Sequence, residues 1–427
     1  MNIFKTLLKP KILLRVTSVR REAGYCILLK ALFEKYGFDV FLSCTRNIDF
    51  ALKFWRPDIV ILGNFNGIER VKKICPDAFF VYLETEGFLI NDTDRADDSF
   101  RNLANLKLYD LILLWGDVQV EGYKKYKDKI NTNNIHAIGN PKMDVIRYLP
   151  LEKIRNGKKT IGFITRFSPI NHHEGVPVLR NLQKKPQLDY SIHCLKSYNV
   201  LHRAITYILD NTNYSVSIRP HPNESIDTYY KYVLPSFKKF KNRIEIDDNL
   251  FISEWIFNQK YIVSTSTTTF IESYVMKTPM INLDFIACTD DYSKAYSELM
   301  SEWINASFLP KSLNELVELV KKKSIVNSDK SIEKQLKKNC NFNKNSSALH
   351  NCVKILKKTY KRKKLKLGIP LFLLEVYDTN LFKRIIKKNP NHKNFSYGKS
   401  FHKPPSYLND FVSKILKNDL NKFKQDK

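Results

Sequence analysis

Residues 58–87 read DIVILGNFNGIERVKKICPDAFFVYLETEG and contain the pattern that decides the fold. Two short apolar runs, DIVILGNF at 58–65 and AFFVYLETEG at 78–87, lie on either side of a segment with helical spacing. Short runs rich in Ile, Val and aromatic residues predict strands, and a helix-length spacer between them predicts a strand–helix–strand unit.

The same alternation continues on both sides of this unit. Further strands before residue 150 are expected at KILLRV (11–16), DVFLSC (39–44), YDLILLWG (109–116) and NIHAIGNP (134–141). Six strand-like runs separated by helical spacers predict a parallel, doubly wound sheet.

The alternation of strand-like runs and helical spacers starts again after Pro150. The later strand-like runs are TIGFITRF (160–167), YSVSIRPHP (214–222), IEIDD (244–248), KYIVSTSTTT (260–269) and PMINLDF (279–285). We therefore expect an α/β protein with two Rossmann-like domains, residues 1–150 and 151–330. Residues 331–427 are Lys-rich and lack strand-like runs, so they predict a basic, mainly helical extension.

Composition and charge narrow the class of protein. With 427 residues, 43% hydrophobic and 12% aromatic, the chain is neither a disordered protein nor a small disulfide scaffold. Residues 331–427 contain 24 Lys and Arg against 6 Asp and Glu, so they carry +18 of the net +28 and leave +10 for the rest. Such a surface favours anionic partners, whether phosphorylated or carboxylated substrates, anionic lipid or nucleic acid. A Lys-rich genome would explain the same charge without any partner.

Neither the cysteines nor the N-terminus indicates export. The seven cysteines are scattered and never form a CxxC pair, which argues against a disulfide framework and a zinc site. The start, MNIFKTLLKPKILLRV, lacks the apolar core of a signal peptide, and no run approaches the ~20 apolar residues of a membrane span. We expect a protein of the reducing cytoplasm.

Ligands of doubly wound sheets bind at the carboxyl ends of the strands, so the residues after each run are the candidates for chemistry. The first candidates are Glu84 and Glu86, which flank Thr85 and precede Gly87. A carboxylate at such a position can act as a general base, and repulsion between two of them could raise one pKa toward neutrality. An ordinary acidic loop is the alternative.

The second candidates are Arg219 and His221, in Arg219-Pro220-His221-Pro222. The two prolines hold the backbone around the imidazole rigid, and Arg219 offers a planar fork for phosphate or carboxylate. An imidazole fixed beside an arginine suits binding or protonating a departing phosphate.

A third candidate is the hydroxyl run 264–269, which precedes the helical segment FIESYVMK. Hydroxyls and backbone N–H groups at a helix N-terminus favour an anion, and Glu272 lies about one turn further, where it could accept hydrogen bonds from a ribose. A simple helix cap is the alternative. The hydroxyl residues taken as ligands are Ser266, Thr267, Thr268 and Thr269.

Weaker signals come from Gly116 and from Asn140 in Gly139-Asn140-Pro141, where a glycine would permit close approach of a ligand to the backbone. The sequences Asp92-Thr93-Asp94 and His172-His173-Glu174 are discounted as metal sites, the latter because adjacent histidines lack helical ligand spacing. No metal is expected. The chain has neither a GxGxxG fingerprint nor a P-loop, which disfavours dinucleotide redox chemistry and ATP hydrolysis.

Six segments, taken in order, resemble the bacterial surface carbohydrate biosynthesis proteins, a glycosyltransferase-like family with the two-Rossmann GT-B architecture. The resemblance covers roughly residues 11–290 and excludes the basic extension. The segments are ETEG, LLWG, GNPKMDVIR, IGFITRF, RPHPNES and STSTTTFIES with KTPMI.

This resemblance implies an acceptor domain followed by a nucleotide-donor domain, and it extends to bacterial sialyltransferases and Kdo transferases of the same fold. In those enzymes an acidic residue is the base on the acceptor hydroxyl, while a histidine and hydroxyls bind the CMP phosphate. By similarity Glu84 or Glu86 is the base, with Glu86 preferred because it adjoins Gly87. His221 is then the partner of the leaving group, and Thr268 and Thr269 are phosphate ligands.

The implied reaction is metal-independent transfer of a nonulosonic or Kdo-like sugar from a CMP-activated donor to a glycan or lipid-linked acceptor. The alternatives are a CDP-glycerol-type glycerophosphotransferase, a UDP-N-acetylglucosamine 2-epimerase of the same fold, and a non-enzymatic adaptor that binds membrane or nucleic acid. No aromatic and basic RNA-binding signature is present, so nucleic acid is not an expected partner. The basic run 354–366 is expected to attract an anionic membrane surface, which would place the protein at the inner face of the cytoplasmic membrane.

Overall fold

The structure is a computed structural model that describes most of the chain. It describes residues 9–44, 48–63, 67–85, 103–125, 132–147, 159–173, 175, 178, 185–249, 251–265, 267–287, 304–322, 330–342, 346–361, 368–377 and 380. The chain divides into two compact units, which are treated separately below. Unit 1 comprises Met1–Leu149 and Gln335–Lys427, and unit 2 comprises Pro150–Lys334.

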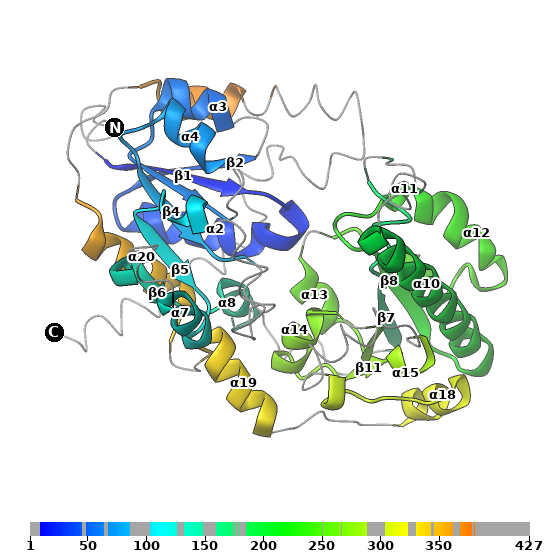
Figure 1. The fold of residues 1–427 in the computed structure, drawn as a ribbon. Helices are drawn as coiled ribbons and strands as arrows, with labels where there is room; N and C mark the ends of the chain where they lie inside the picture. Colours follow the sequence, from blue (N-terminus) through cyan, green and yellow to red (C-terminus); the bar gives the residue numbers. More distant parts are fainter. Residues whose placement is uncertain are drawn as a thin grey trace. The chain divides into compact units, whose positions relative to one another are not determined.

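Unit 1 is built on a six-stranded parallel sheet with the strand order β2-β1-β3-β4-β5-β6 (Figure 1). Along β1 and β3 the side chains on both faces are buried, which is why these strands are continuously apolar rather than alternating. The strands are β1 (Lys11–Val16), β2 (Asp39–Cys44), β3 (Ile59–Leu62), β4 (Phe79–Leu83), β5 (Leu111–Leu114) and β6 (Ile135–Ala137).

Helices cover both faces of this sheet. On one face α2 (Val19–Lys35), α8 (Pro141–Arg147) and α20 (Ala348–Thr359) contact one another, and α20 also contacts β5. On the other face Leu13, Val60 and Phe80 point into a core with the elements η1 (Ala51–Trp55), α4 (Ile68–Ile74) and α7 (Asp117–Lys124). The remaining elements are α3 (Ile48–Phe50), α6 (Leu103–Leu106), η3 (Thr132–Asn134) and α19 (Lys330–Cys340), whose C-terminal half belongs to unit 1.

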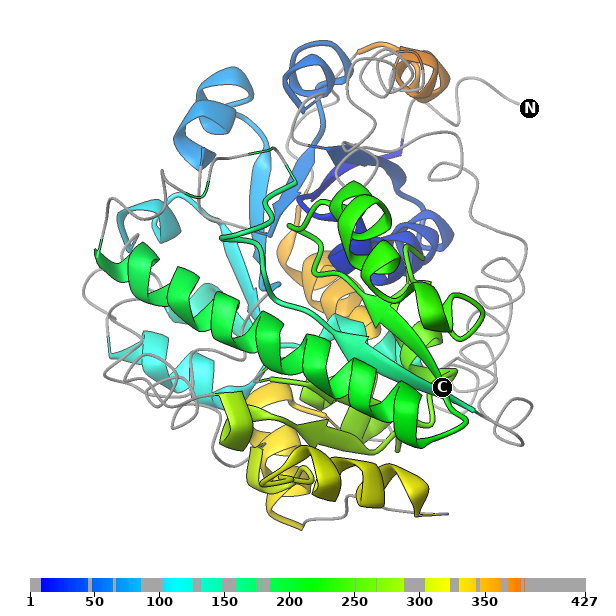
Figure 2. The ribbon, with the colours of Figure 1, turned by 90° about the vertical axis from the view of Figure 1, so that its right-hand side faces the viewer.

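Unit 2 contains a five-stranded parallel sheet with the order β11-β10-β7-β8-β9. The long helix α10 (Lys185–Asn211) lies along it (Figure 2). Its residues Leu201, Ile205 and Ile208 share a buried core with residues of β7 and β8. The strands are β7 (Thr160–Ile164), β8 (Ser215–Arg219), β9 (Ile244–Ile246), β10 (Tyr261–Ser264) and β11 (Met280–Asn282). The other helices are α11 (Ile226–Thr228), η4 (Tyr229–Val233), α12 (Leu234–Ser236), η5 (Lys238–Phe240), α13 (Ile252–Phe257), α14 (Thr269–Val275), α15 (Asp284–Ala287) and α18 (Leu313–Lys321).

The expected fold class is confirmed. Each of the eleven strands found in the described residues lies within the run predicted for it, and every pairing between these strands is parallel. Within the described ranges, no helix combines the length and the hydropathy required to cross a membrane.

The C-terminal extension, expected as a module of its own at 331–427, packs in its described part onto unit 1. Asp144 of α8 accepts hydrogen bonds from Ser347 Oγ and from the backbone N–H of Leu349, both at 2.8 Å. The backbone N–H of Asn140 donates to the carbonyl of Cys340 at 3.0 Å. These long-range bonds hold α19 and α20 against the carboxyl ends of β5 and β6.

Gly116 is required where α19 meets β5. A Cβ atom at this position would lie 2.4 Å from the carbonyl oxygen of Lys338, which is backbone and cannot rotate away. We expect Gly116→Ala to destabilise the protein by about 1–3 kcal/mol, the usual cost of overpacking, and to lower its melting temperature. In Gly122→Ala, on α7, the added Cβ has nothing within 4 Å. This control should melt at or above the wild-type temperature, and equal melting of the two variants would contradict the packing argument.

Candidate functional site

The strand order of each sheet reverses at one point. In unit 1 the chain passes from β1 to β2 on one side and returns to β3 on the other, so the order reverses between β1 and β3. In unit 2 the reversal lies between β7 and β10. Ligands of open α/β sheets bind at the carboxyl ends of the strands beside such a reversal. In each unit we therefore expect a ligand to bind at the carboxyl ends of the strands on either side of this reversal.

At this edge of unit 1, Glu84 follows β4 directly and is buried. Its carboxylate accepts hydrogen bonds from Tyr82 Oη at 2.9 Å and from the backbone N–H of Thr85 at 2.8 Å. The indole N–H of Trp115, at the end of β5, donates to the Glu84 carbonyl at 2.9 Å. The carboxylate is thus held by groups of its own segment, and Trp115 ties the backbone of Glu84 to the end of β5.

The surroundings of Glu84 suit proton transfer near neutral pH. Burial has the largest effect and raises the pKa of Glu84 to about 7. The hydrogen bonds from Tyr82 and Thr85 oppose this rise, as do the positive charges of Lys142 and Arg21. A carboxyl group with a pKa near the working pH is suited to act as a general base or acid.

Three of the expected site residues, Glu86, Gly87 and Ser266, lie outside the described residues. The structure therefore brings Glu84 to the edge of unit 1 and leaves the choice between the two carboxylates open. Asp92-Thr93-Asp94 and Glu174 are also outside the described residues.

In unit 2, His221 lies just beyond the end of β8 and is half-buried. The backbone N–H of Asn223 donates to its Nδ1 at 3.1 Å, so the neutral ring carries its proton on Nε2. The imidazole is therefore held as a donor through Nε2, which is the form that can donate to a phosphate oxygen.

Glu224 holds the loop around His221 in place. Its fully buried carboxylate accepts hydrogen bonds from the backbone N–H groups of Phe167 at 2.6 Å and His221 at 3.3 Å. The hydroxyls of Thr165 and Tyr229 also donate to it. Burial raises the pKa of Glu224 to about 7, against the lowering effect of these donors. Sequence reasoning missed Glu224, because its surroundings depend on Thr165 and Phe167, which lie more than 50 residues earlier in the chain.

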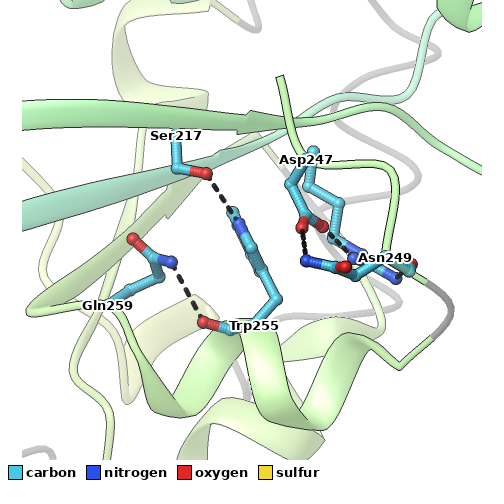
Figure 3. Close-up of polar contacts among 6 residues, drawn as sticks. Ser217, Asp247, Asn249, Trp255 and Gln259 are labelled. Carbon is cyan, nitrogen blue, oxygen red and sulfur yellow. Dashed lines mark hydrogen bonds and ion pairs between the residues drawn. The ribbon is translucent and has the colours of Figure 1, made fainter. Parts of the chain in front are cut away.

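Arg219 is committed to partners inside unit 2. Its buried guanidinium forms an ion pair with Asp247 and donates to the carbonyl of Asn249 at 3.0 Å. Figure 3 shows Asp247 and Asn249 beside Trp255, whose indole N–H donates to Ser217 Oγ at 2.9 Å. These contacts tie β8 to the loop after β9, and the expected phosphate contact of Arg219 stays a prediction.

The hydroxyl run lies at the end of β10, beside the reversal point of the sheet. Thr267 and Thr269 are buried and their hydroxyl oxygens are 3.3 Å apart, whereas Thr268 is exposed. Ser264 Oγ donates to the carbonyl of Ile164 at 2.9 Å and ties the ends of β10 and β7 together. Glu272 is half-buried on α14. Thr268 and His221 follow β10 and β8, the two strands on either side of β7, so both residues come after strand ends at the same edge of the sheet.

Gly116 and Asn140 both contact the C-terminal extension. Gly116 permits a close backbone approach, but the approaching group is the chain's own α19. Asn140 is buried, its backbone N–H donates to Cys340, and its side chain accepts from the N–H of Lys142 at 3.0 Å. Both residues hold the C-terminal extension on unit 1.

The structure draws attention to the loop between β1 and α2, which sequence reasoning passed over. Ser18 and Arg20 are buried there, and Glu22 accepts from the backbone N–H of Thr17 at 2.8 Å. Arg21 pairs with Glu22 at 3.0 Å. The strand order identifies this loop as a candidate, because the loop follows β1 beside the reversal between β1 and β3. That reversal is not visible in the sequence. Within the described parts of the chain, no cluster of His, Cys, Asp and Glu could hold a metal ion.

The titration of Glu84 predicts a pH-dependent stability. Its folded-state pKa of about 7 lies above that of an unfolded glutamate, so the folded state binds the extra proton and stability falls as pH rises from about 4.5 to about 7. Glu84→Gln stays neutral and does not lose stability in this way. Its melting temperature should therefore increase relative to that of the wild type as pH rises across this window. Glu121→Gln, an exposed change on α7, should run parallel to the wild type. A pH profile of Glu84→Gln parallel to the wild type would mean that Glu84 does not titrate as described.

No family model matches the sequence, and no curated protein has a significantly similar one. Solved structures are similar in fold. A histidine-to-asparagine variant of the wall teichoic acid polymerase TagF is 10% identical, with a TM-score of 0.54 over 82% of this chain and 89% of that one. The same variant soaked with CDPG is 12% identical, with a TM-score of 0.50 over 82% and 89%.

MnaA of S. aureus in complex with UDP is 13% identical, with a TM-score of 0.50 over 84% of this chain and 100% of that one. At such low identity these similarities establish the fold alone. Together with the two parallel sheets, they show that the chain has the two-domain GT-B fold expected from its sequence.

Proposed function

We propose that the protein is a metal-independent glycosyltransferase of bacterial surface polysaccharide synthesis. It would transfer a nonulosonic or Kdo-like sugar from a CMP-activated donor to a glycan or lipid-linked hydroxyl. The observation that carries the proposal is the fixed imidazole of His221, which offers Nε2–H at the carboxyl edge of unit 2. The ordered motifs of the sequence and the GT-B fold agree with it.

In this reaction the bond between the sugar and the CMP phosphate breaks, and its electron pair passes to the phosphate oxygen. The departing CMP gains one negative charge, and hydrogen bonds from His221 Nε2–H and from the exposed hydroxyl of Thr268 would stabilise it. Glu224 contributes by holding the His221 loop before the substrate arrives.

The acceptor hydroxyl must lose a proton as it attacks the sugar. Glu84 or Glu86 would take this proton, and the pKa of about 7 at Glu84 makes its carboxylate available near neutral pH.

Transfer of glycerol phosphate from CDP-glycerol is the second candidate. The similarity to TagF, of which one structure was soaked with CDPG, favours it. Both candidates release CMP, so the same His221 and Thr268 contacts would serve either donor. They differ in the group that is transferred, which carries a carboxylate in the first case and a phosphate in the second.

Nucleotide binding tests the donor class. Thermal-shift measurements with CMP, CDP, UDP and GDP should show the largest rise in melting temperature with a cytidine nucleotide. A ligand at 100 times its dissociation constant stabilises the folded state by about 2.7 kcal/mol. Greater stabilisation by UDP or GDP than by both cytidine nucleotides would contradict the donor assignment and, for UDP, would favour an epimerase-like reaction.

Removal of the imidazole tests the site. His221→Ala should lower the rate of CMP release about 10²–10³-fold, as expected for loss of one positioned donor. His202→Gln is the control, because that half-buried histidine lies on α10 and stacks on Phe237. Glu84→Gln and Glu86→Gln, measured alongside, identify the base as the one whose loss abolishes transfer. Unchanged CMP release in His221→Ala would refute the assigned role.

A further inference from the structure

Exposed apolar side chains concentrate at one place on unit 1. Half of the large hydrophobic side chains that are exposed in the described residues lie there, and elsewhere they occur singly or in sequence-adjacent pairs. Phe372 is 61% exposed and Val376 55% exposed. The full set, here called the apolar patch, is Phe54, Phe372, Leu373, Val376 and Tyr377.

The patch stands on a fixed base. On the helical segment 371–377, Leu374 is fully buried in the core of unit 1. The backbone N–H of Ile369 donates to the carbonyl of Phe54 at 2.9 Å, and the rings of Phe50 and Tyr377 stack with centroids 3.7 Å apart. Figures 1 and 2 show this orange segment beside α3 in both views. Because one side of the segment is anchored, the patch side chains are held outward on a rigid support.

Two exposed cations lie beside Phe54 of the patch. Lys53 and Arg56 are exposed on either side of Phe54, and Glu375 is the acidic residue within the described helical segment. The run 354–366 precedes the segment in sequence, and residues 331–427 carry a net charge of +18. A total charge of +28 opposes contact between two copies of the chain and attracts an anionic surface.

We propose that the apolar patch docks unit 1 onto an anionic bilayer. Phe372, Leu373 and Val376 would enter the boundary between headgroups and acyl chains, while Lys53 and Arg56 contact anionic headgroups. Apolar side chains on one helix side combined with flanking cations are the usual features of an interfacial helix. The proposal concerns a surface and does not depend on the identity of the nucleotide donor.

Vesicle co-sedimentation of the full chain tests the proposal. Wild type should bind vesicles of phosphatidylcholine with phosphatidylglycerol, bind pure phosphatidylcholine weakly, and lose affinity as salt increases. The double variant Phe372→Ser/Val376→Ser should bind anionic vesicles on the order of tenfold more weakly, because membrane affinity scales with buried apolar area. Phe285→Ser is the matched control, because Phe285 is 63% exposed on unit 2 and lies outside the patch.

A second variant tests the charges without altering the patch. Lys53→Gln/Arg56→Gln should reduce binding to anionic vesicles and leave the weak binding to phosphatidylcholine unchanged. The melting temperature of each variant and its response to CMP, which the patch should not affect, show that the fold is intact. Equal vesicle binding by wild type and Phe372→Ser/Val376→Ser would overturn the proposal. A wild-type dimer that the same variant dissociates, without vesicle binding, would instead identify the patch as a contact between copies.

Discussion

Parallel pairing of strands is the constraint on which the rest of the structure depends. Each parallel crossover returns the chain to the amino end of the sheet, so all six strands of unit 1 and all five of unit 2 end at one edge. Side chains far apart in sequence, such as Thr165 and Glu224, meet there because their strands are neighbours. The candidate site residues lie at these edges because parallel connections bring the carboxyl ends of all strands of a sheet to the same side.

Each unit has a buried glutamate after one of its strands, and the two glutamates differ in their hydrogen-bond partners. Burial raises the pKa of both Glu84 and Glu224 to about 7, yet their hydrogen bonds differ. Glu84 accepts from Tyr82 and Thr85, next to it in the chain, and lies beside Lys142. Glu224 accepts from its own loop and from the distant residues Thr165 and Phe167, and so fixes the His221 loop in place. The first is suited to proton transfer and the second to positioning.

The C-terminal extension packs against the carboxyl ends of β5 and β6 in unit 1. Gly116 and Gly139 lie beyond β5 and β6, and both meet backbone or Cβ atoms of residues 338–348. Asp144 then accepts two hydrogen bonds from the start of α20. The extension is therefore part of the core of unit 1 at one end, and at the other it presents Phe372 and Val376 to the surroundings.

Local sequence was sufficient for the fold class and the positions of the strands. Apolar runs such as 11–16 and 58–65 are continuous because both faces of their strands are buried, so strand positions and the parallel class could be predicted from the chain alone. The types of residue at strand ends, including Glu84, His221 and Thr268, followed from the same rule.

Tertiary structure alone decided which groups surround the residues at the strand ends. Arg219 faces Asp247, and Gly116 faces α19, because partners 28 and more than 200 residues away occupy their surroundings. Burial of Glu224, the reversal of strand order beside Ser18 and the exposure of Phe372 likewise depend on contacts between distant segments. A sequence pattern records the preferences of neighbouring residues, whereas burial and hydrogen bonding at a site depend on which distant groups the fold brings there.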